Sequence, residues 1–517
     1  MPHAHMSARA MKHRDRFSLA AWCGALVAGG LILIAASSPT VASEPLDSAP
    51  TWHGGFARIE ITPEFPLGMA GYGGRSEQAS ESLTPLFAKA MVLEDASGQR
   101  LVLVTLDLVG IHREQAQQLR TLIACTQSTD PERVVLACSH THTGPVVGQN
   151  LGAMHYWRMD EAGQAAVDRY AARINELIPT VVEQAEERLA PITLSWGLGD
   201  CPLAVNRRNN SEPNVPMSRA AGELRGPVDH RVPVLAARDS DGELIGIVFG
   251  YACHATVLSS TQWSGDYPGF AQAALEERFP AAVAMFWAGC GADQNPLPRR
   301  TNELARHYGE RLAGSVESVL RTHELRVLAP QTTASRETLP LAIDAETDLE
   351  FWRGQLGADD SFQRGRARYI LESLDEDGAI PTAYPYEVVG WVLGQEASVD
   401  ADADGDSRQV AWVFLGGEVV VDYSLALRQW ESPPAGSANR ATGFDSVWVT
   451  AYANDVMAYI PSRRVLAEGG YEGGGAMLYY GLPGLWTESI EGDIQESVAR
   501  MLESDLTHRP PLPRLDD

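Results

Sequence analysis

The stretch Cys138-Ser139-His140-Thr141-His142-Thr143-Gly144-Pro145 follows an apolar run, Val134 to Ala137, and places two histidines just before a Gly-Pro turn. This pattern predicts a buried strand that ends in a polar loop. Residues i and i+2 of an extended segment share a face, so we expect His140 and His142 to project the same way, within reach of one metal ion or one substrate. Without other residues to complete a site, such a pair is more typical of two hydrogen-bonded histidines at a strand end.

Two further apolar runs end in polar loops that contain glycine. Leu244 to Cys253 leads to His254 and then to Ser264-Gly265-Asp266-Tyr267, while Ala284 to Ala288 leads to Gly289-Cys290-Gly291-Ala292-Asp293-Gln294-Asn295-Pro296. Neighbouring strand ends form the ligand-binding crevice of open α/β sheets. We therefore expect the three loops to meet.

Strands and helices are predicted to alternate along the chain, which is typical of an α/β fold. A carboxylate, Glu418, follows a Gly-Gly turn and opens a stretch of helical character, Val419 to Trp430. A helix start keeps such a carboxylate ionised and able to bind metal. Helices are expected over about 112–125, 160–189, 268–279, 301–321 and 488–506, and further strands over 101–106, 410–415 and 447–453.

The composition indicates a soluble globular protein with an acidic surface. The 517 residues include 41 basic and 67 acidic side chains, a formal net charge of −26. No basic stripe interleaved with aromatic residues is present, so nucleic acid is not an expected partner.

The N-terminus has the pattern of an export signal. Basic residues precede an apolar run, Phe17 to Ala36, and small residues follow at Val41-Ala42-Ser43. We predict a signal over residues 1–43 and a catalytic domain over 44–517. The run is also long enough for an uncleaved membrane anchor, which leaves membrane association through this segment open. Both alternatives predict an exported protein, periplasmic or secreted.

The five cysteines beyond this segment are an odd number and widely spread, which argues against a disulfide framework. Cys138, Cys253 and Cys290 lie beside the motifs described above. Small buried residues are the more common meaning of such cysteines. A cysteine hydrolase that uses Cys138 or Cys290 with a nearby histidine stays open as an alternative.

Two loops suggest ligand contacts and a third resembles a calcium loop. Glycines in Gly68 to Arg75 would let the backbone approach a ligand, although a surface turn is equally expected. An arginine in the polar loop Ala204 to Asn210 could hold a carbonyl or an oxyanion. Asp400 to Asp406 resembles the opening of a calcium loop, but Ala411 stands where a bidentate glutamate is needed, so a solvated hairpin is favoured.

The motifs in their order resemble the neutral ceramidase family, the neutral/alkaline non-lysosomal ceramidases, from about Gly54 to the C-terminus. They are His-Thr-His-Thr-Gly-Pro, the strand-end histidine, the Asp293 loop, Gly-Glu, the Asn454 loop with its tyrosine, and Tyr-Glu-Gly. The resemblance implies mixed β-sheets flanked by helices in an α/β/β/α layering, with the active site at strand ends. It also implies a zinc ion. The implied zinc ligands are His140, His254, Glu418 and Tyr459.

The resemblance further implies hydrolysis of a linear amide by zinc-hydroxide attack, with N-acylsphingosine (ceramide) as the best single substrate. Nitrogen and carboxylate ligands suit zinc, which lowers the pKa of a bound water to roughly 7. His142, beside the metal but carried over as a non-ligand, could exchange protons with the attacking water and the departing amine. Arg207 and Tyr471, which match the family's Asn-Arg and Tyr-Glu-Gly motifs, could donate to the developing oxyanion.

Two features depart from the family pattern. Asn295 stands where the family has a serine that is sometimes proposed as a nucleophile, so a serine acyl-enzyme is not expected here. The family's C-terminal β-sandwich domain is expected to be absent. An exported binding protein with a degenerate site is the non-enzymatic alternative, and the oligomeric state stays open.

Overall fold

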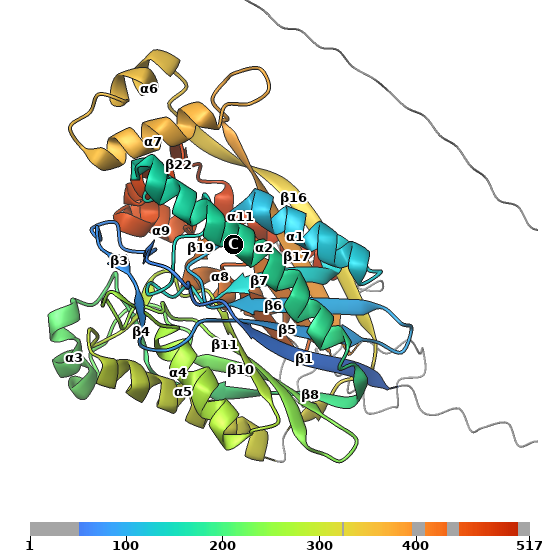
Figure 1. Cartoon of the computed structure of the whole chain (residues 1–517). Helices are drawn as coiled ribbons and strands as arrows, with labels where there is room; N and C mark the ends of the chain where they lie inside the picture. The colour runs from blue at the N-terminus through green and yellow to red at the C-terminus, as the bar shows by residue number, and fades with distance from the viewer. Residues whose placement is uncertain (1–50, 323–324, 395–408, 432–443, 505–517) are drawn as a thin grey trace, which may run out of the picture. The chain divides into compact units, whose positions relative to one another are not determined.

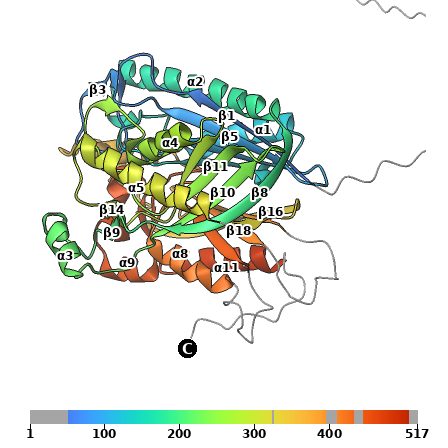
Figure 2. The same cartoon turned by 90° about the horizontal axis from the view of Figure 1, so that it is seen from below.

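Two β-sheets stack face to face, and helices cover both outer faces (Figures 1 and 2). The computed structural model describes residues 51–322, 325–394, 409–431 and 444–504. The layered α/β/β/α fold class predicted from the sequence is confirmed. The predicted export segment and the Asp400 loop lie outside the described residues.

The larger sheet has nine strands, most of them antiparallel. Its two parallel pairs, β6/β7 and β11/β13, lie at opposite edges, and each is joined by a crossover helix, as parallel strands require. The path is β13 (Val283–Ala288), β11 (Leu244–Tyr251), β10 (Arg231–Arg238), β8 (Ala190–Asp200), β1 (Trp52–Glu60), β5 (Phe87–Glu94), β6 (Arg100–Leu106) and β7 (Val134–Cys138), with β15 (Arg326–Val327) paired to β8.

The smaller sheet has five strands and packs against the larger one through a core rich in tryptophan. Trp412 and Trp448 from this sheet contact Trp287 of β13, and Trp391 contacts Trp412, with ring centroids 5.2 to 6.5 Å apart in the contacting pairs. Buried aromatic rings contribute large apolar areas to a core. The strand order is β20 (Ser446–Thr450), β18 (Val410–Leu415), β17 (Ala383–Leu393), β16 (Thr332–Ala345) and β22 (Gly484–Trp486).

The helices follow from amphipathic sequence periodicity. On the larger sheet lie α1 (Arg113–Thr126), α2 (Glu161–Glu186), α4 (Asp266–Arg278) and α5 (Asn302–Arg321), and on the smaller one α8 (Val421–Leu427) and α11 (Ile490–Ser504). The predicted helices at 112–125, 160–189, 268–279, 301–321 and 488–506 are present within a few residues. The remaining helices are α3 (Val215–Ala221), α6 (Leu349–Gln355), α7 (Ser361–Glu372), α9 (Arg463–Glu468) and α10 (Met477–Tyr480).

Short strand pairs hold the loops at the strand ends. They are β2 (Leu67–Gly68) with β3 (Gln78–Ala79), β4 (Glu81–Ser82) with β12 (Gln262–Trp263), β9 (Ala204–Asn206) with β14 (Gln294–Pro296), and β19 (Glu418–Val419) with β21 (Tyr459–Ile460). The last two pairs carry residues of the candidate site.

The segment that follows β20 bridges both edges of the larger sheet. Ala451 N donates to the O atom of Ala288, the last residue of β13 (2.9 Å), whereas Cys138 N in β7 donates to Tyr452 O (3.2 Å). Asn454 N also donates to Leu136 O at 2.7 Å. This bridge brings the C-terminal half of the chain to the strand ends that carry the histidines.

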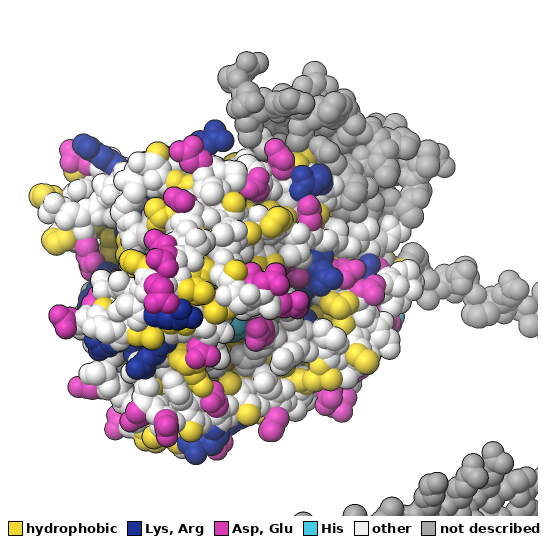
Figure 3. All heavy atoms as spheres, turned by 90° about the horizontal axis from the view of Figure 1, so that it is seen from above, with side chains coloured by type: hydrophobic (Ala, Val, Ile, Leu, Met, Phe, Trp, Pro, Cys, Tyr) yellow, Lys and Arg dark blue, Asp and Glu magenta, His cyan; other side chains and the backbone are white. Residues whose placement is uncertain are grey.

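None of the described helices is both long and apolar enough to span a bilayer. On the face drawn in Figure 3, the described acidic and basic side chains are interspersed among apolar ones.

Candidate active site

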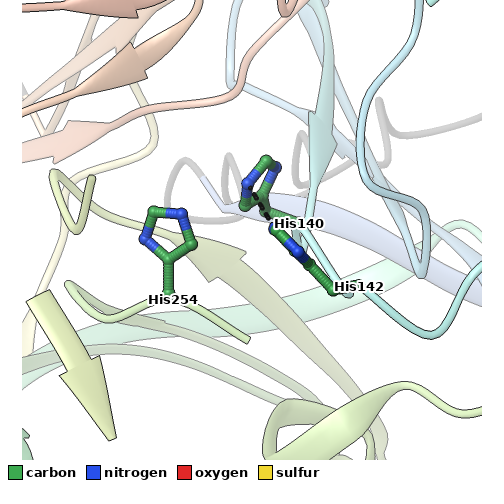
Figure 4. A group of neighbouring side chains, drawn as sticks. All are labelled: His140, His142 and His254. Carbon is green, nitrogen blue, oxygen red and sulfur yellow. Dashed lines mark hydrogen bonds between the residues drawn. The ribbon is translucent and has the colours of Figure 1, made fainter. Parts of the chain in front are cut away.

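Three histidines converge at the strand ends (Figure 4). The ligand atoms of His140, His142 and His254 all lie within 4.8 Å of one another, and all three side chains are buried. His140 Nε2 lies 3.1 Å from His142 Nε2. Glu418 Oε2 lies 3.3 Å from His140 Nε2 and 3.0 Å from His254 Nε2. Four predicted site residues thus surround one point.

Backbone carbonyls orient two of the three imidazole rings. His140 Nδ1 lies 2.7 Å from Val109 O, and His254 Nδ1 lies 2.8 Å from Gly291 O. A carbonyl oxygen only accepts, so each Nδ1 carries the proton and each Nε2 presents a lone pair to the centre. This arrangement is typical of metal-binding histidines.

His140 reaches the centre by a backbone conformation that the sequence did not reveal. Strand β7 ends at Cys138, and His140 has a φ of +57°, in the left-handed region that is uncommon for non-glycine residues. The expectation that His140 and His142 share a face of an extended strand was therefore wrong. The turn at His140 brings the two rings together instead.

The glycine-rich loop packs against His142. Gly71 has a φ of +90°, and a Cβ atom there would lie 2.5 Å from His142 Cγ. The Tyr72 ring contacts the His142 ring edge-on, with centroids 4.7 Å apart, and Arg75 Nη1 donates to His142 O. The absence of a side chain at Gly71 therefore lets the loop backbone pack closely against His142.

Glu418 is positioned by a strand pair, which corrects the prediction of a helix start. Helix α8 begins only at Val421, and Glu418 lies in β19, where it pairs directly with Tyr459 of β21. The Tyr480 hydroxyl donates to Glu418 Oε1.

The donor set fits a divalent metal ion. Glu418 Oε2 is fully buried and has no hydrogen-bond partner among the described residues. An unpaired buried carboxylate oxygen is costly unless a cation compensates it. Burial lowers the pKa of His254 to about 4 and that of His142 well below its ordinary value, so the rings are neutral near pH 7, the form that binds metal. Imidazole, carboxylate and phenol donors suit zinc.

Arg207 connects the centre to the loops around it. Its guanidinium donates to Glu472 Oε1 (2.7 Å), to Tyr459 Oη (3.0 Å) and, more weakly, to Asn295 Oδ1 (3.4 Å). Tyr459 Oη lies 3.5 Å from His254 Nε2. The Tyr471 ring stands 5.4 Å from that of Tyr459 and is 43% exposed. All seven predicted site residues thus gather around one centre, with Tyr471 outermost.

Sequence reasoning missed two aromatic residues of the site. Tyr480 bonds Glu418, and the Tyr452 ring stacks on His140 with centroids 4.3 Å apart. Tyr452 lies near the end of the predicted strand 447–453, so the strand-end argument that selected His254 would have found it. No local pattern marks Tyr480, since only the fold brings it to Glu418.

The cysteines beside the motifs are not in a state to act as nucleophiles. Cys138 and Cys290 are fully buried, and burial raises the pKa of both thiols. A nucleophilic cysteine requires an accessible thiolate. The geometry therefore disfavours the cysteine hydrolase alternative.

Comparison with known proteins assigns the family. The model of the neutral/alkaline non-lysosomal ceramidase N-terminal region matches residues 53–288, which include His140, His142, Arg207 and His254. The matched region belongs to the neutral/alkaline non-lysosomal ceramidase family. The resemblance expected from the motifs is confirmed over this matched region.

Individual relatives share moderate sequence identity with this chain. Neutral ceramidase from Pseudomonas aeruginosa is 26% identical over 515 residues, which cover 89% of this chain and 72% of that protein. Neutral ceramidase from Drosophila pseudoobscura pseudoobscura is 24% identical and covers 81% of this chain. The chain spans 59% of the Drosophila protein and 33% of neutral ceramidase 1 from Arabidopsis thaliana.

Solved neutral ceramidase structures share the fold. The crystal structure of the Pseudomonas aeruginosa neutral ceramidase superposes with a TM-score of 0.66 at 20% identity, covering 90% of this chain and 76% of that one. A ceramidase complexed with C2 gives a TM-score of 0.63 at 19% identity.

Proposed function

We propose that the protein is an exported, zinc-dependent amidohydrolase that cleaves a linear N-acyl amide, with N-acylsphingosine as the first substrate to test. The observation that carries this proposal is the convergence of three histidine rings, two of which, His140 and His254, place Nε2 within 3.3 Å of Glu418 Oε2. The names of the relatives, neutral ceramidases, support the choice of substrate.

Four residues would hold the zinc ion: His140, His254, Glu418 and Tyr459. Bound zinc supplies a Lewis acid and makes water a nucleophile near pH 7. The carbonyls of Val109 and Gly291 fix the histidine tautomers for this role.

His142 would move the proton. It is buried and neutral, and its Nδ1 has no hydrogen-bond partner among the described residues. A neutral imidazole can accept a proton from water and return it to the departing amine. Arg207 would hold Tyr459 in place while the exposed Tyr471 donates to the oxyanion that develops on the carbonyl.

The test is hydrolysis by the purified, zinc-loaded protein of N-acylsphingosine and of N-acyl amino acids. We expect release of fatty acid, loss of activity on chelation and recovery when zinc is restored. Glu418→Gln is the matched control, because it keeps the side-chain shape but removes the charge. Failure of the zinc-loaded protein to hydrolyse either class would contradict the proposal.

Export is tested separately. We propose that residues 1–43 direct the chain out of the cytoplasm. N-terminal sequencing of the protein from the extracytoplasmic fraction should begin after Ser43 if the signal is cleaved, and at the initiator methionine if it anchors the chain. Recovery only from the cytoplasm would refute export.

A further inference from the structure

A hydrophilic cleft of about 670 Å³ opens beside the site. Arg207 and Tyr471, which both contact Tyr459, and Asn295, which contacts Arg207, are part of its lining, so the cleft extends to the candidate site. The rest of the lining is mainly polar and charged, and Leu297 is its one aliphatic side chain among the described residues. An alkyl chain gains little in such surroundings, since apolar ligands favour apolar walls.

The charged side chains of the cleft largely neutralise one another. Arg299 forms a two-pronged ion pair with Glu212, with Nη2 2.8 Å from Oε2. Arg208 contacts both Glu468 and Glu472. The cleft therefore offers hydrogen bonding rather than a net charge, and it suits the polar half of a substrate.

Asn295 lines this cleft and has an uncommitted hydrogen-bond donor. It is only 4% exposed, and its Oδ1 accepts from Arg207 Nη1 and Thr256 Oγ1, each at 3.4 Å. A guanidinium can only donate, so the amide oxygen must face Arg207. The amide nitrogen consequently points away from Arg207.

The Nδ2 atom of Asn295 is the free donor of this side chain. It has no hydrogen-bond partner among the described residues. It is also absent from the group of unpaired polar atoms that are fully buried, so part of its surface is accessible. It therefore keeps contact with the space that Asn295 lines. Asn210, which lines the same cleft, differs: its Nδ2 donates to Asn206 O (2.8 Å) and Arg225 O (2.7 Å).

We propose that Asn295 Nδ2 recognises an oxygen acceptor on the amine half of the substrate. The preferred substrates are then N-acyl amines that carry a hydroxyl or carboxylate oxygen close to the scissile nitrogen. Because Asn295 contacts Arg207 and Arg207 contacts Tyr459, a group held by Asn295 lies next to the amide under attack. This inference rests on the proposed function and specifies its substrate class.

A substrate without the acceptor leaves the donor unpaired once water is displaced from the cleft. That cost corresponds to a loss of about tenfold or more in affinity. Asn295 thus favours amides whose amine half carries an oxygen acceptor, and this preference does not depend on the acyl chain.

The test measures binding of three ligands with one acyl chain to the metal-free protein by titration calorimetry. They are N-octanoylglycine, N-octanoylethanolamine and N-octanoylpropylamine. We expect the first two to bind about tenfold or more tightly than the third. In Asn295→Asp, which keeps the acceptor for Arg207 and removes the amide donor, the carboxylate ligand should lose its advantage entirely. The hydroxyl ligand should keep part of its advantage, because a hydroxyl can donate to Asp.

Two further variants complete the design. Asn210→Asp is the matched control and should keep the wild-type ratios, because its amide serves the loop backbone. Asn295→Ser replaces Asn295→Asp if the latter does not fold, and should reduce both ratios. Equal binding of the three ligands by the wild type, ratios unchanged in the Asn295 variants, or no binding of any ligand would overturn the proposal. If the zinc-loaded protein hydrolyses amides but the three ligands bind equally, the proposed hydrolase function stands and the role of Asn295 is refuted. If the ligands bind with the expected preference but no amide is hydrolysed, only the proposed hydrolase function is refuted.

Discussion

His142 differs from the two other histidines of the cluster in the environment of one atom. His140 and His254 each use Nδ1 for a backbone carbonyl, whereas His142 Nδ1 has no partner among the described residues. Metal-binding histidines almost always engage the second nitrogen. We expect His142→Ala to keep about one zinc per chain and to lower kcat by roughly a hundredfold to ten-thousandfold, as measured by elemental analysis and steady-state kinetics.

His140→Ala is the matched comparison for this prediction. It removes a ring whose tautomer is fixed toward the centre, so zinc should be lost together with activity. Equal loss of zinc from the two variants would make His142 a ligand and add it to the proposed set.

The buried thiols lead to a second prediction at this scale. Cys125 is exposed, whereas Cys138, Cys201, Cys253 and Cys290 are buried. Among these five, iodoacetamide should modify only Cys125 in the native protein, and hydrolysis should be unaffected. Peptide mass spectrometry locates the adducts. Inactivation that parallels modification of Cys138 or Cys290 would restore the cysteine hydrolase.

Residue types could be predicted from the sequence better than their conformations. His140, His254 and Tyr459 stand out as polar residues at the ends of apolar runs. The positive φ of His140 could not be predicted, because it depends on contacts made by other segments, including Val109 O and Tyr452. The role of Tyr480 depends entirely on where the fold places it.

The glycine-rich loop is the element whose geometry bears most directly on His142. In Gly71→Ala, the new Cβ would meet the His142 ring at 2.5 Å in a backbone conformation that alanine rarely adopts. The ring must move, and a displacement of about 1 Å in a catalytic group costs on the order of a hundredfold in kcat. Kinetics of the purified variant check this.

Gly74→Ala provides the control within the same loop. Gly74 has an ordinary φ, and no atom lies within 4 Å of the added Cβ. It should retain wild-type kcat and melting temperature. If the two variants behave alike, the loop does not act by positioning His142.

Elements with strong local patterns were predicted well, and those fixed by distant pairing were not. Helix α5 and strand β18 follow from their own periodicity and are found within a residue of the prediction. Glu418 was assigned to a helix start because Val419 to Trp430 looks helical. The pairing of Glu418 with Tyr459, 41 residues away, makes β19 a strand instead, and such a pairing has no local signal.

Asp455 couples the stability of the whole molecule to pH. It is buried, its Oδ1 has no partner among the described residues, and burial raises its pKa to about 7. The unfolded chain, with a pKa near about 3.9, releases this proton first. Between those values the folded state holds the extra proton, so the contribution of Asp455 to stability falls as pH rises.

Asp455→Asn removes this titration and keeps an acceptor for the Tyr384 hydroxyl. The stability of the variant relative to wild type should rise by roughly 2 to 3 kcal/mol between pH 5 and pH 8. Urea unfolding at both pH values measures the difference. The exposed Asp241→Asn should show almost no such change, and a flat difference for Asp455→Asn would place the folded pKa near its ordinary value.

At the scale of the whole molecule, the alternation of strands and helices predicted the α/β class. The stacking of two sheets was implied only by the family resemblance. The bridge at Ala451 to Asn454 was not predicted at all, because its partners in β7 and β13 lie more than 150 residues earlier.

That bridge also affects how late during synthesis the edges of the larger sheet become paired. Until Ala451 to Asn454 have been synthesised, β7 and β13 lack the backbone partners that the segment supplies, and unpaired edges of this kind recruit other strands. His140, His142 and His254 are synthesised earlier than Glu418 and Tyr459, which belong to the same late part of the chain as the bridge. Completion of the candidate metal site and pairing of the two strand edges thus occur at the same late stage of synthesis, and we expect nascent chains stalled before residue 450 to depend most on chaperones.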